Sequence, residues 1–266
     1  MRFLDVPTRL PLVLATLLLG ACSGTPPESA EGPAGPWARG WRYAADTPPV
    51  TARNGMVVTT DELASQVGVD VLQAGGNAVD AAVAVSFALA VVNPEAGNIG
   101  GGGFMVARLA DGTTAALDYR ETAPAAADRD MYLDADGNLT DGSVVGHLAS
   151  GVPGTVRGLW EAHQRFGSLP WADLVGPAVA LAEGFPVRER FLGSLGTSMV
   201  EALSAFEASA RQFLPREGAP PQVGDTLRQA DLARTLVRIR DDGPDGFYGG
   251  ETADLIVAEM ERGGGL

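Results

Sequence analysis

Apolar residues recur every three to four positions through much of the chain, a spacing typical of helices with one buried face. Leu63, Val67 and Val71 form such a stripe, and Thr60 or Asp61 can cap the helix that carries it. The pair Gly75-Gly76 follows the stripe. Because glycine adopts the left-handed conformation that ends many helices, we predict that this helix stops there.

The segment from Ala78 to Val92 is apolar nearly all round, interrupted by Asp80 and Ser86. A helix that is apolar on every side belongs inside a protein or a membrane. At 15 residues it is shorter than the ~20 residues of a membrane span. We therefore predict a central buried helix, which Pro94 prevents from continuing.

A β-hairpin is predicted after this helix. Four glycines at 100–103 lead into a strand at Phe104, and Asp111-Gly112 is a turn signal between two alternating runs. On the return strand Ala115, Leu117 and Tyr119 share one face, with Asp118 and Arg120 on the other. Arg120 thus ends a strand beside a glycine loop, where a guanidinium can bind an anion.

The remainder is predicted to be mainly helical. A short buried strand is expected at Met56–Thr59, before the first helix. Pro177 is expected in the first turn of its helix, where proline lacks no needed hydrogen bond. Helices are expected from Thr155, over Trp171–Glu183, around Met199–Gln212 and Ala230–Arg240, and from Thr252 to Gly263.

Composition excludes several functions. The 266 residues carry a net charge of −14, which disfavours a nucleic-acid partner because phosphate backbones require a basic surface. All 19 basic residues are arginine. Without lysine, neither a phosphate-binding loop of the Walker type nor a lysine Schiff base can form. With 45% hydrophobic residues, the chain can build a sizeable core.

The two histidines do not suggest a metal site. His147 and His163 are sixteen residues apart, which matches no zinc-ligand spacing. His163 falls on the inner face of a predicted helix, and His147 lies in a loop without a visible acidic partner. We expect structural roles for both, and no metal ion or organic cofactor.

The N-terminus divides into two segments before the globular region. Residues 1–21 contain an apolar run of the length of a signal-peptide core, ending in Leu-Gly-Ala before Cys22, the single cysteine. This tetrapeptide resembles the lipobox of bacterial lipoproteins, and the alternative is an ordinary cleaved signal. Residues 22–52 are rich in Pro, Gly and Ala and are predicted to be a linker; the globular region is expected at 53–266.

Five blocks of sequence resemble the N-terminal part of bacterial γ-glutamyltranspeptidase, also called glutathione hydrolase. They occur in the family's order. The blocks are GVDVLQAGGNAVDAAVAVSFALAVVNPEAGNIGGGGFM from Gly68, DYRETAPAAADRDMYLD from Asp118, HLASGVPGT from His147, GDTLRQADLA from Gly224 and GPDGFYGG from Gly243.

The resemblance implies an α+β fold: a helix-rich, partial αββα sandwich of the N-terminal-nucleophile hydrolases, with residues 53–266 as an incomplete large-subunit region. It implies a proenzyme that cleaves itself, so that a small subunit becomes the partner. The threonine that starts that subunit attacks the γ-glutamyl amide. In the family's D-[FY]-R-E motif the arginine, here Arg120, holds the α-carboxylate of the γ-glutamyl substrate.

The resemblance places that threonine beyond Leu266, so no catalytic residue is expected within these residues, and the chain alone is expected to be inactive. Two alternatives remain open. One is a cephalosporin-type acylase of the same fold. The other is a non-catalytic surface lipoprotein that binds small acidic ligands. For the enzyme, we expect export to the periplasm or cell surface and a lipid anchor on Cys22.

Overall fold

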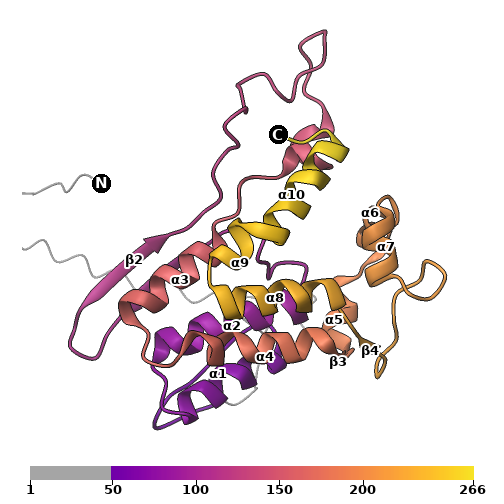
Figure 1. The fold of residues 1–266 in the computed structure, drawn as a ribbon. Coiled ribbons are helices and arrows are strands. Elements are labelled where there is room, and N and C mark those ends of the chain that lie inside the picture. The colour runs from indigo at the N-terminus through magenta and orange to yellow at the C-terminus, as the bar shows by residue number, and fades with distance from the viewer. Residues whose placement is uncertain (1–48) are drawn as a thin grey trace, which may run out of the picture. The chain divides into compact units, whose positions relative to one another are not determined.

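The computed structural model describes residues 49–266, and Ala52–Leu266 form a compact unit (Figure 1). The predicted signal peptide, Cys22 and most of the predicted linker lie outside the described residues. The elements are α1 (Glu62–Gln73), α2 (Ala78–Val92), β1 (Phe104–Arg108), β2 (Thr114–Asp118), η1 (Asp141–Ser143), η2 (His147–Ala149), α3 (Thr155–Phe166), α4 (Trp171–Glu183), β3 (Phe185–Pro186), α5 (Glu189–Ser194), α6 (Thr197–Ser204), α7 (Glu207–Phe213), β4 (Thr226–Leu227), α8 (Ala230–Asp242), α9 (Asp245–Tyr248) and α10 (Gly250–Gly263).

Both predicted N-terminal helices are confirmed, together with their boundaries. Asp61 caps α1 by accepting a hydrogen bond from the Leu63 backbone N–H at 2.8 Å. Gly75 follows the helix with a φ of +94°, the conformation expected of a terminating glycine. Helix α2 starts with a capping box between Asn77 and Asp80, in which each side chain accepts from the other residue's backbone.

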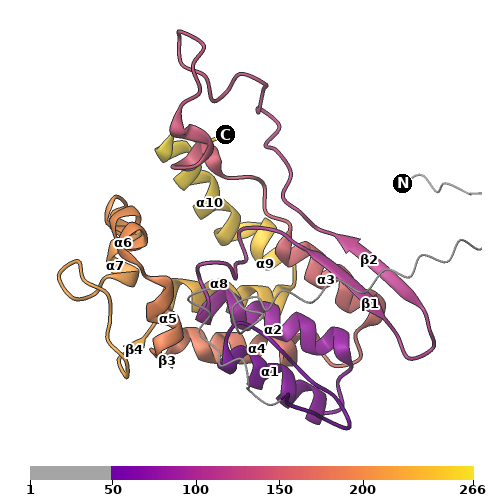
Figure 2. The same cartoon turned by 180° about the vertical axis from the view of Figure 1, so that it is seen from behind.

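Helix α2 is the central helix of the core. Most of its residues are buried, and it packs between α1 and α4, while α4 packs on α8 (Figures 1 and 2). The Phe87 and Trp171 rings meet edge to face at 5.5 Å. The Trp171 indole N–H donates to the Ile239 carbonyl at 2.8 Å, which joins α4 to α8. These contacts stabilise a four-helix core of α1, α2, α4 and α8.

The predicted hairpin is also confirmed. Strands β1 and β2 are antiparallel, with Phe104 opposite Asp118 and Arg108 opposite Thr114. Gly112 in the turn has a φ of +90°. Alternate residues are half-buried and exposed along both strands, and the hairpin lies alongside α3 (Figure 2). The alternation arises because successive strand side chains point to opposite faces.

Three predictions about local structure were wrong. Residues Met56–Thr59 form no strand, and Val58 is 81% exposed. No strand among residues 49–266 lies beside this segment to pair with it. The predicted helix over 199–212 is split into α6 and α7, because Phe206 adopts an extended conformation between them. Ser204 at that break donates its hydroxyl to the Val200 carbonyl, a bond that often bends helices.

The third wrong prediction concerns Pro177, which lies in the middle of α4 rather than in its first turn. A proline inside a helix removes one backbone hydrogen bond, which usually breaks the helix. Here Leu174, Val175 and Ala178 are fully buried around it. Their packing holds the helix intact.

None of the helices among the described residues combines the length and apolarity needed to cross a bilayer.

Candidate carboxylate-binding site

Arg120 lies two residues beyond the last residue of β2, on the polar face that the alternation predicts. Its backbone N–H donates to the Asp118 carboxylate at 3.0 Å, which fixes the turn of the chain after the strand. The side chain is 61% exposed. The strand therefore presents a guanidinium to solvent from a well-ordered backbone position.

The guanidinium has one ion-pair partner among residues 49–266. Its Nε donates to Glu121 Oε2 at 2.8 Å. Its Cζ lies 5.8 Å from the centre of the Phe104 ring, a cation–π distance. These two contacts orient the planar group while both Nη atoms stay without a protein acceptor in the described part of the chain.

Glu121 is held as an ionised partner. Hydrogen bonds from its own backbone N–H and from the Arg120 side chain lower the pKa of its carboxyl group. Glu121 also lines an open hollow of about 440 Å³ with Thr122, Tyr132 and Ser150. The ion pair with Glu121 uses only the Nε–H of Arg120. The N–H groups of Nη1 and Nη2 can therefore donate to a second carboxylate.

The glycine loop before β1 is fixed to the start of α3. The Gly101 carbonyl accepts from the backbone N–H groups of Gly154 and Thr155, at 2.7 and 3.0 Å. Thr155 also donates its hydroxyl to Asn98 Oδ1 at 3.3 Å. The helix that Thr155 was predicted to cap is confirmed, but Thr155 is its first residue and Gly154 is the N-cap, without a side-chain cap. These contacts bring the loop, β2 and α3 to one place.

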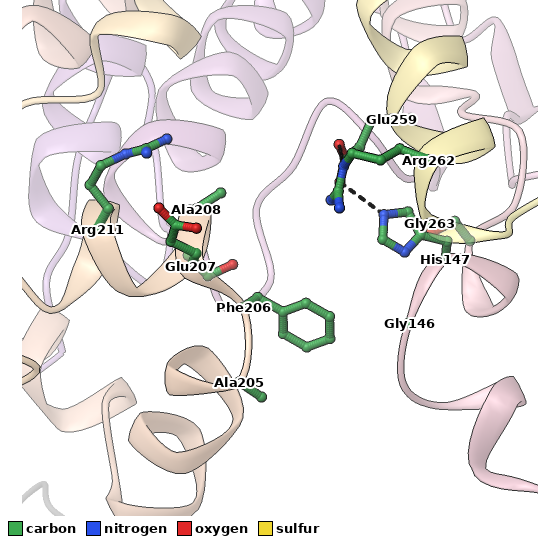
Figure 3. A pocket seen from close by; sticks show the side chains of 12 residues that line it. Gly146, His147, Ala205, Phe206, Glu207, Ala208, Arg211, Glu259, Arg262 and Gly263 are labelled. Carbon is green, nitrogen blue, oxygen red and sulfur yellow. Dashed lines mark hydrogen bonds and ion pairs between the residues drawn. The ribbon is translucent and has the colours of Figure 1, made fainter.

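His147 has an acidic partner, which corrects the expectation from the sequence. Its Nε2 lies 2.9 Å from Glu259 Oε1, and Glu259 also binds Arg262, both from α10 (Figure 3). Arg262 and His147 lower the pKa of Glu259 to about 2. Glu259 is 112 residues from His147 along the chain, so no local pattern indicated the pair.

A hollow of about 790 Å³ lies beside the Glu259–Arg262 ion pair. Phe206, Glu207 and Arg211 lie across it from His147, as Figure 3 shows. The charged groups of α10 that line it, Glu259 and Arg262, are already paired with each other. We therefore assign His147, Glu259 and Arg262 a structural role in holding η2 against α10.

His163 has the structural role predicted for it. Its Nε2 lies 2.8 Å from the Leu169 carbonyl, and its ring packs beside Trp160 and Trp171. Both histidines are thus satisfied by protein groups. Within residues 49–266, no group of three or more His, Cys, Asp or Glu side chains could hold a metal ion.

Comparison with known proteins identifies the family. The family model for gamma-glutamyltranspeptidase matches residues 64–266. The chain is 48% identical to the glutathione hydrolase proenzyme of Escherichia coli K12 over 257 residues, covering 96% of this chain and 43% of that protein. The chain spans about two fifths of the curated bacterial relatives it matches.

Solved structures agree. The γ-glutamyltranspeptidase of Helicobacter pylori matches with a TM-score of 0.79 at 43% identity, over 82% of this chain and 63% of that one. A cephalosporin acylase from Bacillus halodurans matches with a TM-score of 0.70 at 31% identity, over 85% of this chain and 42% of that one. The fold is confirmed as a helix-rich, partial α+β fold of this group of hydrolases. With a family model and close relatives covering most of its length, the chain belongs to the gamma-glutamyltranspeptidase family.

Proposed function

We propose that the chain is the N-terminal portion of an enzyme that cleaves γ-glutamyl amides such as glutathione and transfers the γ-glutamyl group to water or to amino acids. The observation that carries the proposal is Arg120, exposed at a strand end with both Nη atoms free of protein acceptors in the described residues. Family membership supplies the reaction class, because relatives at this identity are named glutathione hydrolases.

In this proposal the Nη edge of Arg120 binds the α-carboxylate of the γ-glutamyl donor. A guanidinium offers two parallel N–H donors that match the two oxygens of a carboxylate, whereas an ammonium is a point charge. Glu121 and Phe104 hold the guanidinium plane, so less conformational freedom is lost on binding. Glu121 carries a negative charge beside the site, which also favours a donor with an α-amino group.

The nucleophile in this proposal is a threonine outside these 266 residues, freed when the proenzyme cleaves itself. Its hydroxyl attacks the γ-carbonyl carbon, its own α-amine takes the hydroxyl proton, and the leaving amine departs with a proton. Water or an acceptor amine then releases the acyl group. The chain alone supplies the carboxylate contact and has no activity.

Arg120→Ala in the full-length protein tests the carboxylate contact. We expect the KM for γ-glutamyl-p-nitroanilide to rise by about tenfold or more with little change in kcat, because a charge-assisted pair contributes equally to substrate and transition-state binding. Arg120→Lys is expected to restore only part of the affinity.

Arg129→Ala is the matched control, since Arg129 is also exposed and also pairs with the next residue, Asp130, at 2.9 Å. It should leave KM unchanged. An Arg120→Ala enzyme with the wild-type KM would show that the carboxylate binds elsewhere.

The second candidate function is a cephalosporin-type acylase, favoured by the likeness to the acylase of Bacillus halodurans. Such an enzyme cleaves an acyl group without an α-amino acid head. Comparing hydrolysis of γ-glutamyl-p-nitroanilide with that of a glutaryl amide separates the two. We expect preference for the γ-glutamyl compound, and a preference for the glutaryl amide would favour the acylase.

A non-catalytic lipoprotein that binds small acidic ligands requires a stop codon directly after codon 266. The reading frame of the gene tests it: a continuing frame with a threonine-led segment supports the enzyme.

The proposed lipid anchor has its own test. Cys22→Ser is expected to abolish labelling by radioactive palmitate and to move the protein from the membrane fraction to the soluble one.

A further inference from the structure

The backbone that carries Arg120 is enclosed by two other segments. Tyr119, its neighbour, exchanges backbone hydrogen bonds with Gly103, at 3.0 and 3.3 Å. Gly102 lies so close that an added methyl group would come within 2.5 Å of the Tyr119 carbonyl oxygen and 2.7 Å of Arg120 Cα. The glycine loop therefore covers one side of residues 119–120.

The first turns of α3 cover the same residues from another direction. A methyl group added at Gly154 would come within 2.1 Å of the Tyr119 carbonyl oxygen, and one added at Gly158 within 2.1 Å of Tyr119 Cγ. Separations under 3 Å are not tolerated without a shift of one partner. The Tyr119 ring thus packs directly on the backbone of α3. Helix α3 lies beside the hairpin, as Figures 1 and 2 show.

Backbone conformation does not explain these glycines. Gly154 has a φ of −112°, which any residue can adopt, and Gly158 lies inside α3, where glycine is a poor helix former. The close approach of Tyr119 is the reason that remains. Glycine at position 158 lowers the helix propensity of α3, but its lack of a side chain lets the aromatic ring of Tyr119 lie against the helix backbone.

Other groups enclose this contact. The Tyr119 ring is half-buried, and burial raises the pKa of its phenol. The ring also lies against Gly103, where an added methyl group would come within 2.9 Å of Tyr119 Cε2, so its shape matches the backbone on this side as well. The Tyr248 hydroxyl joins the two ends of the segment from Pro153 to Arg157. It donates to the Pro153 carbonyl at 2.9 Å and accepts from the Arg157 backbone N–H at 3.3 Å.

We propose that Gly154 and Gly158 are positioning residues for Arg120. They form a seat for Tyr119, and the seated tyrosine fixes the backbone from which the guanidinium reaches the substrate carboxylate. The inference rests on the proposed function, because it assigns these glycines to the affinity of the same site. It adds residues that touch no substrate: Gly158 acts through the Tyr119 ring, and Gly154 acts through the backbone of Tyr119 and Arg120.

Gly158→Ala in the full-length protein is the first test. We expect the KM for γ-glutamyl-p-nitroanilide to rise about ten- to a hundredfold with kcat nearly unchanged, because a displacement of about 1 Å is enough to misplace a binding group. Gly193→Ala is the matched control: Gly193 also lies inside a helix, α5, and an added methyl group there meets no atom within 4 Å. It should leave KM unchanged.

Substitutions of Tyr119 keep the test valid if Gly158→Ala fails to fold. Tyr119→Phe retains the ring and should keep the wild-type KM. Tyr119→Ala empties the seat and should raise KM, and adding Gly158→Ala to it should cause no further rise, since the two residues act through one contact.

Two results would overturn the inference, and they are distinguishable. A wild-type KM in both Gly158→Ala and Tyr119→Ala, with a raised KM in Arg120→Ala, rejects the seat and leaves the proposed function standing. A wild-type KM in Arg120→Ala itself rejects both.

Discussion

The buried carboxylate of Asp80 connects two parts of the chain that are distant in sequence. Its side chain is 0% exposed and accepts hydrogen bonds from the Asn77 N–H at 2.8 Å, the Ser168 N–H at 2.9 Å and the Ser168 hydroxyl at 2.6 Å. Burial opposes its ionisation, but these bonds outweigh burial, so the pKa of Asp80 is lowered. The ionised form is therefore the one that the folded state requires.

The lowered pKa predicts a pH dependence of stability. Because the folded state holds the proton less tightly than the unfolded state, the contribution of Asp80 is fully present above the unfolded pKa, near 4. It is lost as the pH falls through the lower folded pKa. Asp80→Asn should lower the free energy of unfolding by about 2–4 kcal/mol at pH 7, with a smaller difference from wild type below pH 4.

Urea denaturation at several pH values measures the effect of Asp80→Asn. Asp70→Asn is the control, because Asp70 is exposed on α1 and, within residues 49–266, its carboxylate accepts a hydrogen bond from the Gln66 side chain alone. A loss in Asp80→Asn that stays equal at pH 7 and pH 3 would show that its charge is not what the fold needs.

At the scale of elements, glycine sets how closely helices pack. Gly68 is buried in α1, and a methyl group added there would come within 2.7 Å of both Val57 Cγ1 and Val85 Cγ2. Val85 belongs to α2, so the absence of a side chain at position 68 lets the two helices approach. Alanine favours helices over glycine by ~1 kcal/mol, yet it would overpack this contact.

Gly68→Ala is therefore expected to destabilise the protein by about 1–3 kcal/mol, measured by thermal or urea unfolding. Gly193→Ala in α5 meets open space and should be neutral or stabilising by up to ~1 kcal/mol. If both substitutions stabilise, α1 and α2 can separate without cost, and the packing argument is wrong.

At the scale of the whole compact unit, the hairpin exposes apolar surface. Phe104 is 63% exposed and Val106 is 84% exposed, both on the outer face of β1. Within residues 49–266 the hairpin is a sheet of only two strands, so both of its edges are unpaired. Exposed apolar strands with free edges pair readily with other chains.

The chain expressed as residues 53–266 is accordingly expected to self-associate, and Val106→Lys should reduce that association. Thr114→Lys is the matched control, because it adds the same charge on an exposed position of β2 without removing apolar surface. Sedimentation velocity measures both. Equal association in the two variants would show that the exposed face of β1 is not responsible.

The sequence alone determined α1, α2 and the hairpin. The four-residue stripe of α1, the continuous apolarity of α2 and the Asp111-Gly112 turn are local patterns, and the structure confirms all three. The position of Arg120 after the return strand was predicted in the same way, because strand alternation fixes the face of each residue and the turn fixes where the strand returns; its role as a carboxylate-binding residue stays a proposal.

Only the tertiary structure determined which residues distant in the sequence are in contact. Ser168 is 88 residues from Asp80 and Glu259 is 112 residues from His147, so no spacing in the sequence indicated either pair. The contact of Tyr119 with Gly158 could not be predicted from the sequence for the same reason. Local sequence indicates only that a glycine inside a helix is a weak helix former. Only the packed chain shows the ring of Tyr119 against it, because such contacts depend on how whole elements pack together.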